Sequence, residues 1–213
     1  LKEEKPDLLI GFGGYVTAPA AMAAKDLHIP FMLHEQNSII GKANKLVAKD
    51  ASGIVTCYQK ATDDFNLPQV RLLGNPRATL AAKADEDYFR SLGLDPSKKT
   101  ILIVMGSLGS ASVNELMQTA LAKTDPSMQI VYVCGKDNSD ALHQFDSMSN
   151  VHAVGYVDAL RLYGMLDGMV CRAGATTLAE LTALGIPAVI IPSPYVAENH
   201  QFYNAKMLVD EGA

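Results

Sequence analysis

Short apolar runs alternate with longer amphipathic segments along nearly the whole chain. Each apolar run is bounded by turn residues, and the segment after it carries apolar residues at helical spacing. Parallel strands buried on both faces read as continuous apolar runs, and a helix usually supplies the crossover between them. The sequence therefore predicts an α/β protein built on parallel sheets. The expected strands are Leu8–Phe12, Phe31–His34, Ile54–Cys57, Gln69–Leu73, Ile101–Met105, Ile130–Cys134, Val151–Val154, Met169–Cys171 and Ala188–Ile191.

The alternation is interrupted once, where turn residues and charges fill the stretch between Asn75 and Lys99. We therefore expect residues 1–74 to be the C-terminal part of one α/β domain, residues 75–97 an interdomain linker region, and residues 98–213 most of a second domain. The start at Leu1 rather than Met, and the close on a helix end, suggest a chain cut at both ends. The expected helices are Pro19–Leu27, Lys42–Lys49, Glu86–Leu92, Val113–Ala122, Asp140–Met148, Ala159–Leu166, Leu178–Leu184 and Gln201–Asp210.

The charge, the cysteines and the apolar runs of the chain argue against some classes of partner and location. The formal net charge of -5 and the pI near 5.5 argue against nucleic acid, because neutralising phosphates needs a basic excess. Cys57, Cys134 and Cys171 are far apart and end apolar runs, which predicts buried thiols in a reducing compartment. No apolar run approaches the ~20 residues of a transmembrane helix, and no signal peptide opens the chain, so we expect a cytosolic protein.

Ligands of open parallel sheets bind beyond the carboxyl ends of the strands, so the loops there are candidate sites. The first such loop is GFGGYVTAP, where the third glycine of a dinucleotide fingerprint would fall at Val16. It is either a plain glycine-rich turn or a place where a ligand approaches the backbone. The second is HEQNS (His34–Ser38), whose histidine, carboxylate and amides suit acid–base chemistry or hydrogen bonds to a sugar.

Two further loops combine small residues with a following helix. GSLGSAS frees the backbone at Gly106 and Gly109, and the start of the next helix directs N–H groups at one spot, as a phosphate cradle requires. CRAGATTLAE carries Glu180 one turn in. That carboxylate is either a ligand contact or half of a capping box with Thr177, and the residues alone favour neither. A last loop gathers polar residues suited to sugar hydroxyls, namely Asn199, His200, Gln201 and Asn204.

Several motifs follow one another in a specific order: GFGGYVTAP, HEQN, GNPR, GSLGS, RAGATTLAE and HQFYNA. In this order and at this spacing they closely resemble the MurG family of glycosyltransferases, over nearly the whole chain. The resemblance implies the GT-B fold, with two Rossmann-like domains facing each other across a cleft. It also implies an inverting transfer of N-acetylglucosamine from UDP-GlcNAc to undecaprenyl-pyrophosphoryl-MurNAc-pentapeptide, which converts lipid I to lipid II in peptidoglycan synthesis.

The resemblance assigns roles to residues of the donor site. Glu180 would accept hydrogen bonds from the ribose hydroxyls, and Val157 would offer its backbone to uracil. The pyrophosphate would meet Gly106, Ser107 and Gly109, and Arg77, although this arginine stands one position from its place in relatives. The remaining donor contacts would be Ala175, Thr176, Thr177, Leu178 and Ala179 around the nucleoside, and Asn37 and Gln201 at the GlcNAc hydroxyls.

On the acceptor side the resemblance places Gly13, Gly14 and Tyr15, with His34 and Glu35 as candidate catalytic residues. The family's proposed catalytic base belongs to a loop that would precede Leu1, so this chain alone is expected to bind UDP-sugar without transferring it. No metal ligands are implied, and whether a divalent cation takes part stays open.

The lipid acceptor implies a peripheral protein on the cytoplasmic side of the bacterial cell membrane, with cell-wall synthesis and division proteins as further partners. The helix Lys42–Lys49 places Lys42, Lys45 and Lys49 at helical spacing, either to meet anionic lipid or as an ordinary solvated face. Two alternatives remain. One is another UDP-sugar enzyme of this fold, such as a diacylglycerol glycosyltransferase or a UDP-GlcNAc epimerase. The other is a non-catalytic module that binds a nucleotide sugar.

Overall fold

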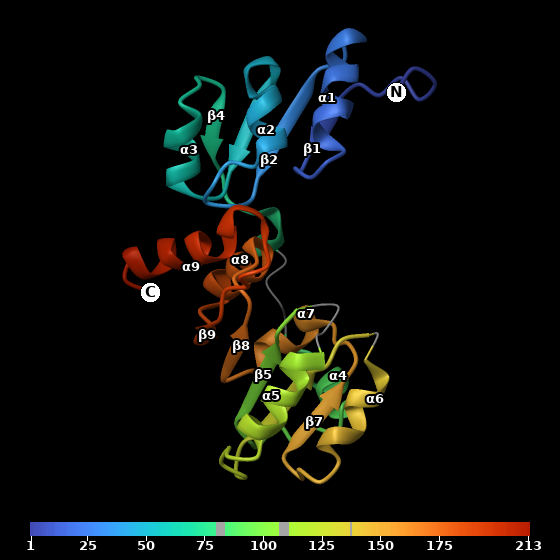
Figure 1. Cartoon of the computed structure of the whole chain (residues 1–213), viewed down its shortest axis with the longest axis vertical. Helices are drawn as coiled ribbons and strands as arrows, with labels where there is room; N and C mark the ends of the chain where they lie inside the picture. Colours follow the sequence, from blue (N-terminus) through green and yellow to red (C-terminus); the bar gives the residue numbers. More distant parts are fainter. Residues whose placement is uncertain (80–83, 107–110, 137) are drawn as a thin grey trace. The chain divides into compact units, whose positions relative to one another are not determined.

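The computed structural model describes residues 1–79, 84–106, 111–136 and 138–213 (Figure 1). Contacts within the chain define two compact units. Unit 1 consists of Leu1–Ala78, Gly174–Ala179 and Ser193–Ala213, and unit 2 consists of Thr79–Ala173 and Glu180–Pro192. Each unit is built on its own parallel sheet, as the alternation of apolar runs and helices predicts.

The sheet of unit 1 has, in the described part of the chain, four parallel strands in the order β1-β2-β3-β4. Leu33 of β2 pairs with Gly11 of β1 and with Ile54 of β3, so the carboxyl ends of the strands meet at one edge. The elements are β1 (Leu9–Gly11), α1 (Thr17–Asp26), β2 (Phe31–Glu35), α2 (Lys42–Val47), the 3₁₀ turn η1 (Ala48–Asp50), β3 (Gly53–Thr56), α3 (Gln59–Phe65), β4 (Val70–Leu72), η2 (Pro76–Thr79), η5 (Ala197–Asn199) and α9 (His200–Asp210).

The described strands of unit 2 form a parallel sheet in the order β7-β6-β5-β8-β9. Read in chain order this is 3-2-1-4-5, so the winding direction reverses between β5 and β8. Such a reversal opens the crevice where doubly wound sheets bind their ligands. The elements are α4 (Glu86–Ser91), β5 (Thr100–Val104), α5 (Ala111–Leu121), β6 (Gln129–Val133), α6 (Ser139–Leu142), η3 (His143–Phe145), β7 (Val151–Val154), α7 (Ala159–Leu162), η4 (Tyr163–Met165), β8 (Gly168–Cys171), the part of α8 (Ala175–Leu184) from Glu180 onward, and β9 (Ala188–Ile190).

Each unit has its own apolar core. In unit 1 the small side chains of Ala21 and Ala24 let α1 approach Phe31 and Leu33 of β2 closely, and Val47 of α2 joins the same cluster. In unit 2 two clusters cover the sheet. One packs Phe89, Leu102, Val131 and Leu162, among others, and the other packs Ile103, Tyr132 and Phe145.

The predicted strands are confirmed, since the bounds of each differ by at most one residue from those in the structure. The helices are predicted less well. The segment Gln59–Phe65 was not expected to be helical, because its sequence QKATDDF is polar apart from Ala61 and Phe65, which it buries. The segments expected at Lys42–Lys49, Asp140–Met148 and Ala159–Leu166 each end early in a 3₁₀ turn. No described helix is long and apolar enough to cross a membrane.

Candidate active site

The point of reversal in the sheet of unit 2 brings together loops that the sequence singles out. Gly106 follows β5 and has a φ of +132°, a conformation that a residue with a side chain rarely adopts, as expected for a loop that lets a ligand approach the backbone. Ser107 and Gly109, the other expected pyrophosphate contacts, lie outside the described residues. Helix α5 begins at Ala111, directly after this loop.

Arg172 follows β8 at the same edge of the sheet. Its Nε donates to the carbonyl oxygen of Met105 at 3.3 Å, and its Nη1 donates to those of Ile191 and Pro192 at 3.2 and 3.3 Å. One guanidinium thus ties the chain after β5 to the chain after β9. Sequence reasoning missed this role, although a charged residue ending an apolar strand at a ligand edge is a signal that could have revealed it.

Glu180 lies in α8 and is only 6% exposed. Its Oε2 accepts a hydrogen bond from the hydroxyl of Tyr163 at 2.8 Å. Helix α8 begins at Ala175, earlier than the expected Leu178, so Thr177 is inside the helix and cannot be its N-cap. The capping-box interpretation of Thr177 and Glu180 is therefore wrong. The small residues Ala175 and Thr176, which the sequence suggested as part of a loop, already belong to the first turn of the helix.

Val157, the expected uracil contact, follows β7 by three residues and is 6% exposed. Its side chain belongs to the core cluster that also contains Leu162 and Tyr163. Only its backbone can therefore serve a ligand, which is the role expected for it. The expected nucleoside contacts Ala175, Thr176, Thr177, Leu178 and Ala179 occupy the first turns of α8.

At the corresponding edge of unit 1, Glu35 ends β2 and is 3% exposed. Its Oε1 accepts hydrogen bonds from the backbone N–H and the side-chain Nδ2 of Asn37, at 3.0 and 3.4 Å. Its Oε2 accepts from the backbone N–H of Gly41 and from Nδ2 of Asn44, both at 2.9 Å. The carboxylate therefore organises the loop between β2 and α2, which fits a structural role better than direct proton transfer.

His34 is buried beside Glu35. Its Nε2 lies 3.2 Å from the carbonyl oxygen of Gly74, to which it donates a hydrogen bond. Among the described residues Nδ1 has no hydrogen-bond partner, and neither have Oγ of Ser38 and Oδ1 of Asn44. Such a group of buried polar atoms is typical of a place that an ordered water or ligand completes.

Cys57 lies close to this histidine, with Sγ 3.9 Å from Nε2 of His34. Burial, and secondarily the charge of Glu35, raise the pKa of the Cys57 thiol to about 11. The thiol is therefore protonated at neutral pH, and it lacks the thiolate that a nucleophilic cysteine requires.

Asn37 and Gln201, the expected GlcNAc contacts, both take part in contacts within unit 1. Asn204 of α9 is fully buried, accepts from the backbone N–H of Ser38 at 2.8 Å, and donates to Oδ1 of Asn37 at 3.1 Å. Gln201 accepts from the backbone N–H of Ser193 at 2.8 Å. The structure thus brings Asn37 and the polar face of α9 together, although they are far apart in sequence.

The glycine-rich loop after β1 forms a tight turn, as its sequence predicts. Gly13 and Gly14 have φ values of +83° and +78°, and the hydroxyl of Thr17 donates to the carbonyl oxygen of Gly13. Tyr15 at its tip is 100% exposed. Arg77 is exposed in η2, where its backbone N–H donates to Oδ1 of Asn75 at 3.0 Å.

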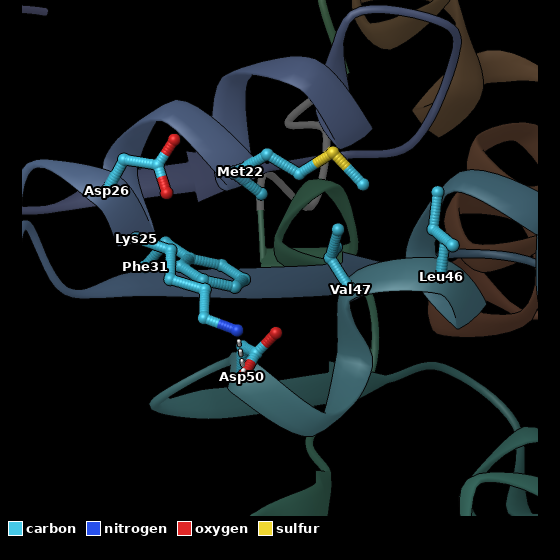
Figure 2. A pocket seen from close by; sticks show the side chains of 8 residues that line it. Met22, Lys25, Asp26, Phe31, Leu46, Val47 and Asp50 are labelled. Atoms are coloured by element: carbon cyan, nitrogen blue, oxygen red, sulfur yellow. Dashed lines mark ion pairs between the residues drawn. The ribbon is translucent and has the colours of Figure 1, made fainter.

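A surface depression of about 340 Å³ lies elsewhere in unit 1, where α1 faces α2 (Figure 2). It contains an exposed ion pair between Lys25 and Asp50, with Nζ and Oδ1 2.8 Å apart. None of the described residues that are expected at the active site lines it. Within the described ranges, no group of three His, Cys, Asp or Glu side chains is placed to hold a metal ion.

Comparison with known families identifies the class of protein. The glycosyltransferase family 28 C-terminal domain matches residues 100–213, and the glycosyltransferase family 28 N-terminal domain matches residues 1–56. The chain belongs to glycosyltransferase family 28. Its two parallel-sheet α/β units are those of the GT-B fold.

Individual curated proteins are similar to this chain over its whole length. Among curated proteins, the UDP-N-acetylglucosamine--N-acetylmuramyl-(pentapeptide) pyrophosphoryl-undecaprenol N-acetylglucosamine transferases of Halalkalibacterium halodurans and Bacillus licheniformis are 41% and 42% identical to it. The matches cover 100% of this chain and 61% and 60% of those proteins. The chain therefore spans about three fifths of the length of these relatives.

Solved structures agree with this. The crystal structure of Acinetobacter baumannii MurG matches with a TM-score of 0.75 at 30% identity, over 100% of this chain and 60% of that one. The UDP-GlcNAc 2-epimerase of Neisseria meningitidis, bound to UDP-GlcNAc, matches with a TM-score of 0.62 at 14% identity, over 100% of this chain and 70% of that one. At that identity the second likeness concerns the fold alone.

Proposed function

We propose that this chain serves the transfer of N-acetylglucosamine from UDP-GlcNAc to undecaprenyl-pyrophosphoryl-MurNAc-pentapeptide, the step from lipid I to lipid II in peptidoglycan synthesis. The observation that carries the proposal is its similarity, along its whole length, to curated transferases named for this reaction. The site supports it, because a buried carboxylate and a glycine-containing loop flank the point of reversal in the sheet of unit 2.

The proposed donor site uses three features of unit 2. Glu180 accepts hydrogen bonds from the ribose hydroxyls, the backbone of Val157 pairs with uracil, and the loop beginning at Gly106 holds the diphosphate. Together they position the anomeric carbon and stabilise the charge that grows on departing UDP. Arg172 keeps the ends of β5 and β9 in place for this purpose, since it donates to carbonyl oxygens after both strands.

In unit 1 the proposed roles belong to the loop after β2. Asn37, with Gln201 of α9, provides amides for the GlcNAc hydroxyls, and Nδ1 of His34, a buried atom with no hydrogen-bond partner among the described residues, is the candidate proton acceptor. Glu35 acts by holding this loop rather than by touching the substrate, because its two oxygens already accept from Asn37, Gly41 and Asn44. Gly13, Gly14 and Tyr15 are proposed to line the acceptor side.

We test the reaction by measuring UDP release by the full-length enzyme with and without lipid I. We expect release only with the acceptor, and tighter calorimetric binding of UDP-GlcNAc than of UDP-glucose or UDP-GalNAc. Glu180→Ala should weaken binding of all three donors alike, because ribose is common to them. Release with a diacylglycerol acceptor, or conversion of UDP-GlcNAc without an acceptor, would instead identify another UDP-sugar enzyme of this fold. Binding without turnover under every condition would favour a non-catalytic module.

We also propose that α1 and α2 contact the inner face of the cytoplasmic membrane. Met22 and Leu46 are 46% and 65% exposed on these helices, and both line the depression in Figure 2. Lys42 and Lys45 are exposed on α2, and Lys49 is exposed in η1 rather than at the end of one long helix as expected. Exposed apolar side chains next to basic ones suit an anionic lipid surface.

Replacing Lys42, Lys45 and Lys49 by Glu should lower binding to vesicles that contain anionic lipid more than tenfold, because each basic residue near such a surface contributes about 1 kcal/mol. Flotation of vesicles measures the bound fraction. The matched control replaces Lys98, Lys99 and Lys123 of unit 2 by Glu and should bind like the unmodified protein. Equal losses in both triple variants would show that net charge, and not this surface, determines binding.

A further inference from the structure

We propose that Tyr163 is a positioning residue for donor recognition: its hydroxyl holds the Glu180 carboxylate in the orientation that the ribose hydroxyls of the nucleotide require. The inference rests on the proposed function, in which Glu180 contacts the ribose. It adds a residue that does not itself touch the donor and that no sequence motif points to.

The hydrogen bond between the two side chains is buried. Oη of Tyr163 lies 2.8 Å from Oε2 of Glu180, and the two residues are 3% and 6% exposed. The phenol of Tyr163 is the donor and the carboxylate oxygen is the acceptor. A hydrogen bond to a carboxylate away from water is among the stronger ones in proteins, and it restricts the orientation of that carboxylate.

A fixed carboxylate suits a pair of neighbouring hydroxyls. It has two oxygens and about four lone-pair sites, so it can accept from Tyr163 and from two ribose hydroxyls together. Glutamate has three rotatable side-chain bonds, and a carboxylate free to turn would lose that freedom only when the nucleotide binds. Holding it beforehand removes this entropic cost from binding.

Tyr163 is itself held firmly. It belongs to the core cluster of unit 2 together with Leu162, which is fully buried. The next residue, Gly164, packs directly on the chain at Ala84, where an added Cβ would stand 2.8 Å from the backbone nitrogen and 2.9 Å from Cα. Because η4 packs tightly against the backbone at Ala84, the position of the Tyr163 hydroxyl does not depend on the nucleotide.

The segment from Val157 to Tyr163 also contains the backbone that is proposed to contact uracil. Val157, α7 and Tyr163 follow one another after β7, and the side chains of Val157 and Tyr163 share one core cluster. The backbone proposed to meet uracil and the hydroxyl that orients Glu180 therefore belong to one packed element. The backbone of Val157 and the hydroxyl of Tyr163 are therefore expected to keep a constant separation.

The test is Tyr163→Phe in the full-length protein, titrated calorimetrically with UDP and with 2′,3′-dideoxy-UDP. The unmodified protein should prefer UDP, and Glu180→Gln should remove most of that preference. Tyr163→Phe should weaken binding of UDP about five- to tenfold, the cost of ordering one flexible side chain on binding, and leave dideoxy-UDP binding nearly unchanged. The expected result is a smaller ratio of UDP affinity to dideoxy-UDP affinity, and not an equal loss of affinity for both nucleotides.

Tyr132→Phe is the matched control. Tyr132 is equally buried, and its hydroxyl donates to Oδ1 of Asn114 within the same unit. This variant loses a comparable hydrogen bond and should keep the UDP preference of the unmodified protein. The inference is overturned if Tyr163→Phe also keeps that preference, or weakens both nucleotides equally. If the unmodified protein shows no preference and Glu180→Gln changes nothing, the ribose role of Glu180 fails, and the inference fails with it.

Discussion

Replacing Glu35 by Ala is expected to lower the free energy of unfolding by about 3 kcal/mol, because its carboxylate accepts four hydrogen bonds within unit 1. The carboxylate is 3% exposed, and its oxygens accept from the backbone N–H groups of Asn37 and Gly41 and from two side-chain amides. Alanine removes this acceptor from all four donors, and the buried Nδ2 of Asn44 then keeps only a long hydrogen bond to the carbonyl oxygen of His34 at 3.5 Å. Donors that lose their acceptor inside the protein cost free energy. Urea denaturation followed by circular dichroism measures the change.

Hydrogen exchange gives a local readout of the same variant. The amide hydrogens of Asn37 and Gly41 should exchange much faster in Glu35→Ala, because they lose their acceptor directly. Glu86→Ala is the control: Glu86 is exposed and pairs with Arg90 one helical turn away, so its loss should change stability by less than about 0.5 kcal/mol. If the two alanine variants are equally stable, Glu35 does not organise the loop after β2.

The parallel sheets could be predicted from sequence because the signal for a buried strand is local. A run such as Ile101–Met105 is apolar throughout, is too short for a helix, and ends at glycine. Burial on both faces then leaves little choice of conformation, and β5 occupies Thr100–Val104. The position of Gly106 after that strand follows from the same pattern, and so does its place at the ligand edge of the sheet.

The contacts that shape the candidate site are not local, and sequence patterns do not reveal them. Asn204 reaches Ser38 and Asn37 across more than 160 positions of the chain. The motif HEQN suggests that His34, Glu35 and Asn37 face a substrate, yet Glu35 turns its carboxylate back onto its own loop. Which polar side chains face a ligand and which hold the loop depends on packing that only the folded chain defines.

Among the described glycines of unit 2, Gly164 is the position where an added Cβ is expected to lower stability most. A Cβ there would stand 2.8 Å from the nitrogen and 2.9 Å from Cα of Ala84, distances that side-chain motion cannot relieve because both atoms belong to the backbone. Gly164→Ala should therefore lower the free energy of unfolding by about 2 kcal/mol, as overpacking typically does. Thermal unfolding followed by calorimetry measures the loss.

Gly155→Ala is the matched control, because its added Cβ would find its nearest neighbours at 3.7 and 3.8 Å, an ordinary contact distance. Its stability should stay within about 0.5 kcal/mol of the unmodified protein. Gly164→Ala should also narrow the preference for UDP over dideoxy-UDP, since moving η4 moves the Tyr163 hydroxyl away from Glu180. If Gly164→Ala lowers stability but leaves the preference for UDP over dideoxy-UDP unchanged, η4 shifts without moving the Tyr163 hydroxyl. The contact between Gly164 and Ala84 then contributes to packing alone.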